Sequence, residues 1–136
     1  MYILKIEHSF DSAHFLNNYN GKCANIHGHR WRVEIEIQSE TLIDDMIEDF
    51  TILKKRIKEV LDFYDHALII EKNSLRKLTF DCLIEDGFRI IELDFRPTAE
   101  NFSKFFFDEI RKLNYDVRKI TVYETPNNSA SYVKEV

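Results

Sequence analysis

The amino-acid sequence predicts an α+β fold, in which an antiparallel sheet of four main strands carries two helices on one of its faces. Three observations lead to this fold class. Two segments near the amino terminus alternate apolar and polar residues, two later segments repeat apolar residues every three or four positions, and two more alternating segments follow. The 136 residues are 44% hydrophobic and 32% charged, with three Gly and two Pro, so we expect residues 1–136 to form a single domain.

The first two predicted strands cover residues 2–10 and 30–37. In the second strand, Trp31 begins an apolar row that continues to Ile37, and charged residues fill the positions between. This period of two indicates strands with one buried face and one polar face. His8 falls on the apolar side of the first strand, where we expect an inward histidine paired with a polar group.

Two amphipathic helices are predicted next. The first begins after Asp49, which can cap its first turn, and ends near Asp62. The second begins with Thr98 as its cap, and four of the chain's phenylalanines and leucines recur along one side of it. Their apolar stripes are the surfaces that would pack against the sheet.

The remaining segments are shorter. Residues 117–124 and 129–136 are predicted strands of a hairpin with a longer loop, formed by the turn-rich sequence TPNNS. Between the two helices, residues 74–87 fit a short helix and 88–95 an additional strand, although their geometry stays open. Cys82 in this region is interpreted as core filling.

Composition excludes several classes of protein. The amino terminus carries Lys5 and Glu7 where a signal peptide would be continuously apolar, and no stretch resembles a membrane span, so we expect a cytoplasmic protein that binds no membrane. Two cysteines far apart in a reducing compartment rarely form a disulfide. The formal net charge of −5 opposes attraction to phosphate backbones, so no nucleic-acid partner is expected.

Three histidines are the candidate metal ligands. His27 and His29 lie two positions apart, so on a strand both would project to the same side. His14 follows the first predicted strand, and pairing of the two strands could bring it alongside. Three imidazoles with an open fourth position form a known catalytic zinc arrangement. Two alternatives remain on the residues alone: ordinary surface or core histidines, and a closed structural site in which Cys23 is the fourth ligand.

Other candidate residues have equally plain structural interpretations. Glu124 would end an apolar row on its strand, where it is either a desolvated carboxylate that needs a partner or the point at which the strand reaches solvent. Asp65 and His66 could form a pair or could be solvated residues in a turn after the first helix. Thr98 is explained by helix capping without any ligand.

Six motifs then carry a resemblance over nearly the whole chain. In order, they are FDSAHFL, CANIHGHRW, EDFTILKK, YDHALI, RPTAENF and VYETPNNSASY. This series resembles the 6-pyruvoyltetrahydropterin synthase family, which includes the bacterial 6-carboxytetrahydropterin synthases. The chain departs from that pattern after His66, where it reads ALIIEKN, and in its long stretch before PTAEN.

The resemblance implies a role for each site residue. It implies zinc as the cofactor, bound by His14, His27 and His29. It implies Cys23 as the catalytic thiol and an Asp65–His66 proton relay. It implies that Glu124 anchors the pterin ring, with Thr98 and Glu100 lining its pocket.

The resemblance also implies a reaction and an assembly. Three residues separate Cys23 from the HGH triplet, a spacing typical of the carboxy branch. That branch is a zinc-dependent carbon–oxygen lyase that converts 7,8-dihydroneopterin triphosphate to 6-carboxy-5,6,7,8-tetrahydropterin, acetaldehyde and triphosphate, on the path to queuosine. The alternatives are a 6-pyruvoyltetrahydropterin synthase and a noncatalytic zinc-stabilised pterin-binding protein. The implied architecture is the tunnelling fold, whose oligomeric barrel is a homohexamer built as a dimer of trimers, with sites between subunits.

Basic residues near the motif are candidates for contact with the triphosphate. Lys22, Arg30 and Arg32 surround the HGH triplet. On an alternating strand, however, basic residues also form an ordinary solvated face. The sequence does not decide between these two interpretations.

Overall fold

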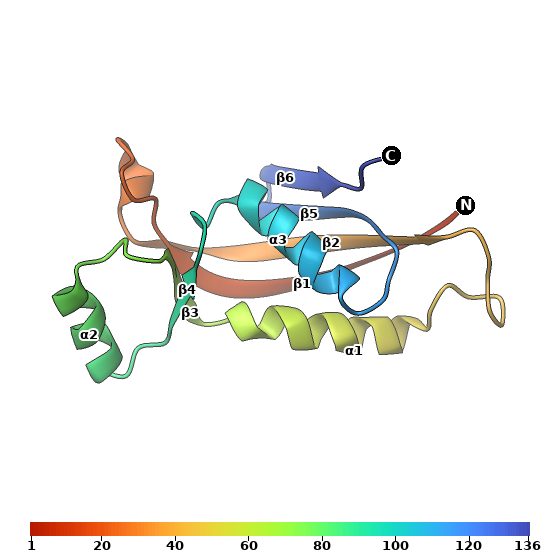
Figure 1. Cartoon of the computed structure of the whole chain (residues 1–136), viewed down its shortest axis with the longest axis horizontal. Coiled ribbons are helices and arrows are strands. Elements are labelled where there is room, and N and C mark those ends of the chain that lie inside the picture. Colours follow the sequence, from red (N-terminus) through yellow and green to blue (C-terminus); the bar gives the residue numbers. More distant parts are fainter.

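The computed structural model describes residues 1–136 as one curled sheet with three α-helices (Figure 1). The strands lie in the order β4-β3-β1-β2-β5-β6. The strands are β1 Tyr2–His14, β2 His27–Ser39, β3 Ala67–Glu71, β4 Ile90–Leu93, β5 Val117–Thr125 and β6 Asn128–Val133. The helices are α1 Phe50–Leu61, α2 Lys77–Glu85 and α3 Ala99–Arg111, and two short 3₁₀ turns are η1 Lys22–Ala24 and η2 Asp62–Tyr64.

Four of the strands form the antiparallel sheet that the sequence predicts. β1 and β2 pair along their full length, from Tyr2 opposite Ser39 to His14 opposite His27. β2 then pairs with β5, and β5 with β6, both antiparallel. The expectation of a longer hairpin loop is wrong, because Thr125 lies opposite Asn128 and the turn between them is tight.

The sheet is larger and more varied than the predicted one. β3 pairs in parallel with β1, and β4 in parallel with β3, so the sheet has six strands and is mixed. Parallel neighbours need a crossover connection, which α2 supplies between β3 and β4. The short helix and additional strand expected before Pro97 are therefore both present. The predicted four main strands and two helices are only part of the fold, because β3 and β4 extend the sheet to six mixed strands and α2 is a third helix.

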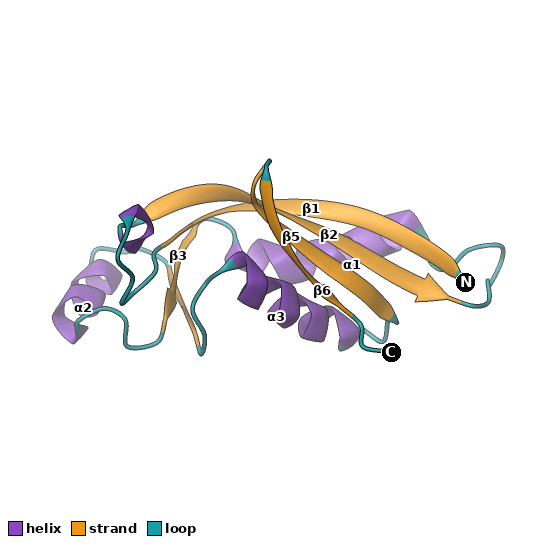
Figure 2. Ribbon diagram, turned by 90° about the horizontal axis from the view of Figure 1, so that it is seen from above, coloured by secondary structure: helices purple, strands orange, loops and turns teal.

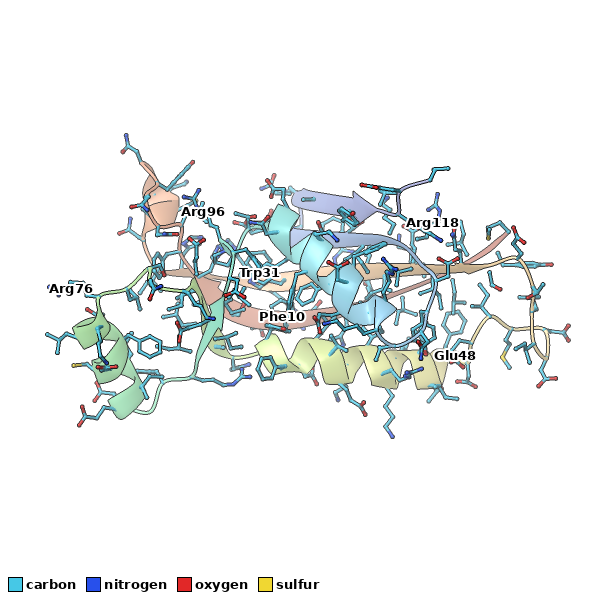
Figure 3. The ribbon with its side chains drawn as sticks, viewed as in Figure 1. Phe10, Trp31, Glu48, Arg76, Arg96 and Arg118 are labelled. Carbon is cyan, nitrogen blue, oxygen red and sulfur yellow. The ribbon has the colours of Figure 1, made fainter.

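Helices α1 and α3 pack on the same face of the sheet (Figure 2). Asp49 caps α1 by accepting from the backbone N–H of Thr51 at 2.7 Å, and Thr98 caps α3 by accepting from the N–H of Asn101 at 3.2 Å. The apolar stripes of both helices join the inner face of the strands in one core of 22 buried residues. Phe10 and Trp31 lie in this core, near the centre of Figure 3.

Helix α2 stands apart from this core. Figure 1 shows it at one end of the molecule, beyond β3 and β4, and none of its residues is buried. Cys82 lies exposed on α2, so its predicted role as core filling is wrong. The helix connects two strands without burying an apolar stripe, because it projects past the end of the sheet.

The face of the sheet away from α1 and α3 is polar and rich in ion pairs. Arg32 contacts Glu7 at 2.9 Å and Glu34 at 2.8 Å, and its guanidinium lies 3.7 Å from the centre of the Tyr123 ring.

His8 is half-buried and paired, as expected, with Nε2 2.7 Å from Oδ1 of Asp62. None of the helices is both long enough and apolar enough to cross a membrane.

Candidate active site

Three imidazoles meet at one end of the two long strands. His14, the last residue of β1, lies directly opposite His27, the first residue of β2. His29 projects to the same face as His27 because side chains alternate along a strand. The ring centroids are 4.5 Å apart for His14 and His27, 4.9 Å for His27 and His29, and 5.1 Å for His14 and His29. Strand pairing therefore brings the three rings together, as the sequence suggested.

Backbone carbonyl groups orient two of these rings. Nδ1 of His14 donates to the carbonyl oxygen of Pro97 at 2.7 Å, and Nδ1 of His27 donates to that of Asn25 at 2.6 Å. Because a carbonyl only accepts, each neutral ring keeps a lone pair on Nε2. The two Nε2 atoms are 3.0 Å apart. Lone pairs at that distance repel each other unless a cation or proton lies between them. Histidine rings that donate through Nδ1 to a fixed acceptor and leave Nε2 free are typical of metal sites.

Glu124 of β5 completes the group. Its Oε1 atom lies 2.9 Å from Nε2 of His29 and 4.0 Å from Nε2 of His14. One donor atom from each of the four side chains lies within 4.8 Å of all the others. Donors of a tetrahedral zinc ion with bonds of ~2.0–2.1 Å stand about 3.3 Å apart, so this set of three nitrogens and one oxygen fits a divalent ion.

Burial favours the neutral form of His14 and His29. It is the main cause that lowers the pKa of His14 below 6.5, and the hydrogen bond to the Pro97 carbonyl opposes it only in part. Burial also lowers the pKa of His29, while the Glu124 carboxylate acts in the opposite direction. Neutral imidazoles are the metal-ligating form, so this environment favours ligation.

Aromatic rings of the core support the histidines. The Trp31 ring is fully buried and packs edge-on against His14 and His29, with centroids 4.9 Å and 5.4 Å away. Phe102 of α3 packs against Trp31 from the core side at 5.0 Å. A close-packed aromatic floor restricts the rotamers of the rings above it.

Asp65 and His66 form a second group, in the turn between η2 and β3. Nδ1 of His66 lies 2.7 Å from Oδ2 of Asp65, and Oδ1 of Asp65 accepts from the backbone N–H of Asp11 at 2.8 Å. The Asp11 N–H is the main cause that lowers the pKa of the Asp65 carboxyl, and His66 adds to it. His66 has a φ of 54°, and its side chain is 79% exposed. The two adjacent residues therefore do face each other, as a relay would require.

Arg89, just before β4, holds this turn and was not identified from the sequence. Its guanidinium donates to the carbonyl oxygen of Asp65 at 2.9 Å and to that of Phe63, and it lies 5.0 Å from the centre of the Phe63 ring. A cation at these carbonyls, just past α1 and η2, also complements the helix dipole. No motif includes Arg89, and only the pairing of β3 with β4 brings it to the turn.

Cys23 is not among the four side chains whose donor atoms could together hold a metal ion. It is half-buried in η1, and its carbonyl oxygen accepts from the N–H of Leu16 at 2.9 Å. The group of possible metal donors consists of the three histidines and Glu124, without the thiol. The closed site with Cys23 as a fourth ligand is therefore not formed in this structure.

The remaining candidates lie around these groups. Thr98 caps α3, and Glu100 is exposed in the first turn of that helix. Arg30 pairs with Asp11 at 3.1 Å, whereas Lys22 in η1 takes part in none of the ion pairs. Arg32 is already neutralised by two carboxylates on the polar face of the sheet. Of the three basic residues considered for the triphosphate, Lys22 is thus the one without a carboxylate partner.

One cleft is lined by one residue from each of these two groups, His29 and His66. It has a volume of about 690 Å³ and is lined by His29 of the metal group, by His66 and by Arg30 and Arg89. Its apolar wall includes Phe88. A cleft of this size is large enough for a small-molecule ligand.

Comparisons with known proteins find relatives that match almost the whole chain. The sequence model of the family described as 6-pyruvoyl tetrahydropterin synthase matches residues 3–135. The 6-carboxy-5,6,7,8-tetrahydropterin synthase of Haemophilus influenzae is 32% identical, covering 97% of this chain and 99% of the relative.

Two solved structures share the fold. An uncharacterized protein from Wolinella succinogenes has a TM-score of 0.84 at 18% identity and covers 98% of both chains. The 6-pyruvoyltetrahydropterin synthase of Plasmodium vivax has a TM-score of 0.76 at 19% identity and covers all of both chains.

Proposed function

Because the chain belongs to the 6-pyruvoyl tetrahydropterin synthase family, we propose that it converts 7,8-dihydroneopterin triphosphate to 6-carboxy-5,6,7,8-tetrahydropterin, acetaldehyde and triphosphate. The relative from Haemophilus influenzae, which bears the name of the carboxy enzyme and matches end to end, supports this choice of product. The main structural support is the arrangement of His14 and His27. Each ring donates its Nδ1 hydrogen to a backbone carbonyl, and the two Nε2 atoms, which keep their lone pairs, lie 3.0 Å apart.

In this proposal His14, His27 and His29 hold a zinc ion. Bound zinc supplies Lewis-acid chemistry, which polarises the hydroxyl oxygens of the substrate side chain and lowers their pKa. The protein's contribution is to fix the three rings before substrate arrives. Strand pairing sets their positions, two carbonyls set their tautomers, and the Trp31 ring packs beneath two of them.

Cys23 is proposed to move a proton at carbon in the substrate side chain. A thiolate is a competent base for this step when positive charge lies nearby. Its position in the short η1 turn, half-buried and outside the group of metal donors, keeps the sulfur available for proton transfer. Asp65 and His66 are proposed to relay protons: the carboxylate accepts the Nδ1 hydrogen of His66 and leaves Nε2 free to exchange a proton with the reacting groups.

Recognition of the pterin ring is assigned to Glu124, with Thr98 and Glu100 lining the pocket. The N3 hydrogen and the 2-amino group of a pterin present two adjacent donors, which suit the two oxygens of one carboxylate. Glu124 is only 30% exposed and makes no ion pair with Lys or Arg, so its charge is available to a ligand. The Thr98 hydroxyl accepts from the backbone N–H of Asn101 at 3.2 Å, which fixes it at the first turn of α3.

We extend the proposal to a homohexamer made of two stacked trimers. The outer edge of β6 is unpaired, and most of β1 pairs only with β2, since β3 meets it only at Ser12 and Ala13. Two free edges of one antiparallel sheet can pair between chains and close a barrel. The polar, ion-paired face of the sheet would then line the inside of that barrel. Sedimentation that finds a stable and fully active monomer would contradict this assembly.

The proposed setting is the cytoplasm, on the path to 7-deazaguanine nucleosides such as queuosine. The nearest alternative is 6-pyruvoyltetrahydropterin synthase activity on the same substrate, a name borne by a fold neighbour of this chain. A noncatalytic, zinc-stabilised pterin-binding protein is the alternative from another class. The exposed position of His66 and its contact with Asp65 favour an enzyme over such a protein.

One product assay tests the proposal. The purified chain, loaded with zinc, is incubated with 7,8-dihydroneopterin triphosphate, and acetaldehyde is measured by mass spectrometry of a trapped derivative. The carboxy reaction releases acetaldehyde together with triphosphate. Triphosphate without acetaldehyde would assign the pyruvoyl reaction, and release of neither would leave a binding protein.

A further inference from the structure

Glu124 lies among the metal donors, and we propose that its carboxylate is a fourth ligand of the metal before substrate binds and is released to the pterin afterwards. This inference rests on the proposed function, because it takes the histidine cluster as the metal site and the pterin as the ligand. It adds a step to the two separate roles of metal ligand and pterin contact: the same carboxylate fills the fourth coordination position of the metal and later binds the substrate.

The contact between Glu124 and His29 carries the first step. Oε1 of Glu124 is 2.9 Å from the buried Nε2 of His29, and the alignment of the two groups is not that of a regular hydrogen bond. Two polar atoms this close without hydrogen-bond geometry are arranged like neighbouring ligands of one ion. Oε1 of Glu124 also lies 4.0 Å from Nε2 of His14, which is compatible with all three atoms binding one ion.

Charge gives a second, independent reason. Glu124 is largely shielded from solvent, and its only charged or chargeable partners within 4.0 Å are His14 and His29. No Lys or Arg is among the ion-pair partners of Glu124, and the donor atoms nearest to its carboxylate belong to the histidine cluster. A shielded carboxylate without a cation is costly. A divalent ion held by the three neutral rings would neutralise it.

Substrate binding would then exchange the ligands. A carboxylate that accepts the two donors of a pterin ring has both oxygens engaged, so it leaves the metal. The side-chain hydroxyl oxygens of the same substrate would take the position that it vacates. Three protein ligands and an exchangeable fourth position characterise catalytic sites, whereas four protein ligands characterise structural ones. Glu124 would therefore occupy the fourth coordination position of the ion until a pterin is bound.

The experiment uses Co²⁺ in the full-length protein, because the visible spectrum of Co²⁺ reports its ligands without any turnover. Wild type, Glu124→Gln and Glu124→Asp are compared with Glu59→Gln, a matched carboxylate exposed on α1 and outside the proposed site. Circular dichroism of each metal-free protein checks the fold. Affinity is measured by competition with a chromophoric chelator, and spectra are recorded with and without 7,8-dihydroneopterin, which lacks the phosphates.

We expect Glu124→Gln to weaken Co²⁺ binding by more than about 100-fold, beyond the 10–100-fold typical of residues that only orient a ligand. Its spectrum should differ from that of wild type, Glu124→Asp should recover part of the affinity, and Glu59→Gln should match wild type. Adding 7,8-dihydroneopterin should change the spectrum of wild type and leave that of Glu124→Gln unchanged.

Other results would overturn the inference. Wild-type affinity and spectrum in Glu124→Gln would make the residue a pterin contact only, and a smaller loss with an unchanged spectrum would make it a charged neighbour. Failure of the proposed function can be distinguished from failure of this inference. In that case the Co²⁺ experiments would give the expected results, but the zinc-loaded protein would release no acetaldehyde. A wild-type chain that takes up no divalent ion would end both.

Discussion

The histidine cluster and the group formed by Cys23, Asp65 and His66 are built in different ways. The histidines stand on long paired strands, where His14 is 2% exposed and carbonyls hold two of the rings. The other residues stand on short turns, where His66 has a positive φ and is 79% exposed. A single chain thus assembles the candidate metal ligands, whereas His66 of the proposed proton relay stays open to solvent.

This difference indicates what a second chain would add. Reactive residues are often placed on loops that a rigid scaffold positions, and strained backbone concentrates where function requires it. A surface that covers His66 in an assembly would exclude water from the relay without altering the buried histidines. The two regions should therefore respond separately to mutation, and the following predictions test that separation.

Removal of a metal-ligating ring should have the largest effect. For His27→Ala we expect loss of metal by more than about 100-fold in affinity, together with loss of activity, because one of the converging nitrogens is gone. Metal content after dialysis and chelator competition measure this. His8→Ala is the matched control on β1, since His8 pairs with Asp62 outside the cluster. Retention of stoichiometric metal by His27→Ala would show that the cluster is not the metal site.

Removal of the thiol should separate chemistry from metal binding. For Cys23→Ala we expect kcat to fall by about 10²–10⁴-fold, the usual contribution of a general acid–base group, with metal content unchanged. Cys82→Ala, an exposed cysteine on α2, serves as the control and should keep full activity. If metal and activity declined in parallel in Cys23→Ala, sulfur would be a ligand after all.

A smaller effect should follow from loosening the turn that carries His66. Arg89→Met removes donors to the Asp65 and Phe63 carbonyls, and ~1 kcal/mol of lost hydrogen bonding corresponds to a fall in kcat of about fivefold. Metal affinity should not change. Arg89→Lys should restore part of kcat, and Arg111→Met, which removes another guanidinium near a phenylalanine ring, should have no effect. Equal loss of kcat in Arg111→Met would indicate a general structural effect.

The sequence predicted the part of the fold that depends on local period. The alternation from Trp31 to Ile37 and the caps at Asp49 and Thr98 identified long strands and helices correctly. β3 and β4 span only five and four residues, and their parallel pairing depends on contacts distant in sequence. A short apolar run does not reveal its neighbour, so the mixed part of the sheet could not be derived.

In the candidate site, too, the features that follow from local sequence period could be predicted, and those that depend on tertiary contacts could not. The convergence of His14 with His27 followed from strand period and hairpin pairing, which the sequence contains. The carbonyls that set their tautomers belong to Asn25 and Pro97, and a backbone group has no signature of its own in the sequence. The approach of Glu124 to the rings depends on how β5 packs beside β2, which is settled only in three dimensions.

The pH dependence of stability should be the most modest effect, and it concerns the histidine cluster alone. Burial lowers the pKa of His14 and His29 below 6.5, so as pH falls through that value the unfolded chain binds protons that the metal-free folded protein does not. The free energy of unfolding therefore decreases below pH 6.5 and does not depend on these rings above it. Urea unfolding of the metal-free protein at pH 7.5 and pH 5.5 measures the change. His14→Gln should reduce the pH dependence. An equal pH dependence in wild type and His14→Gln would mean that solvent already reaches the cluster.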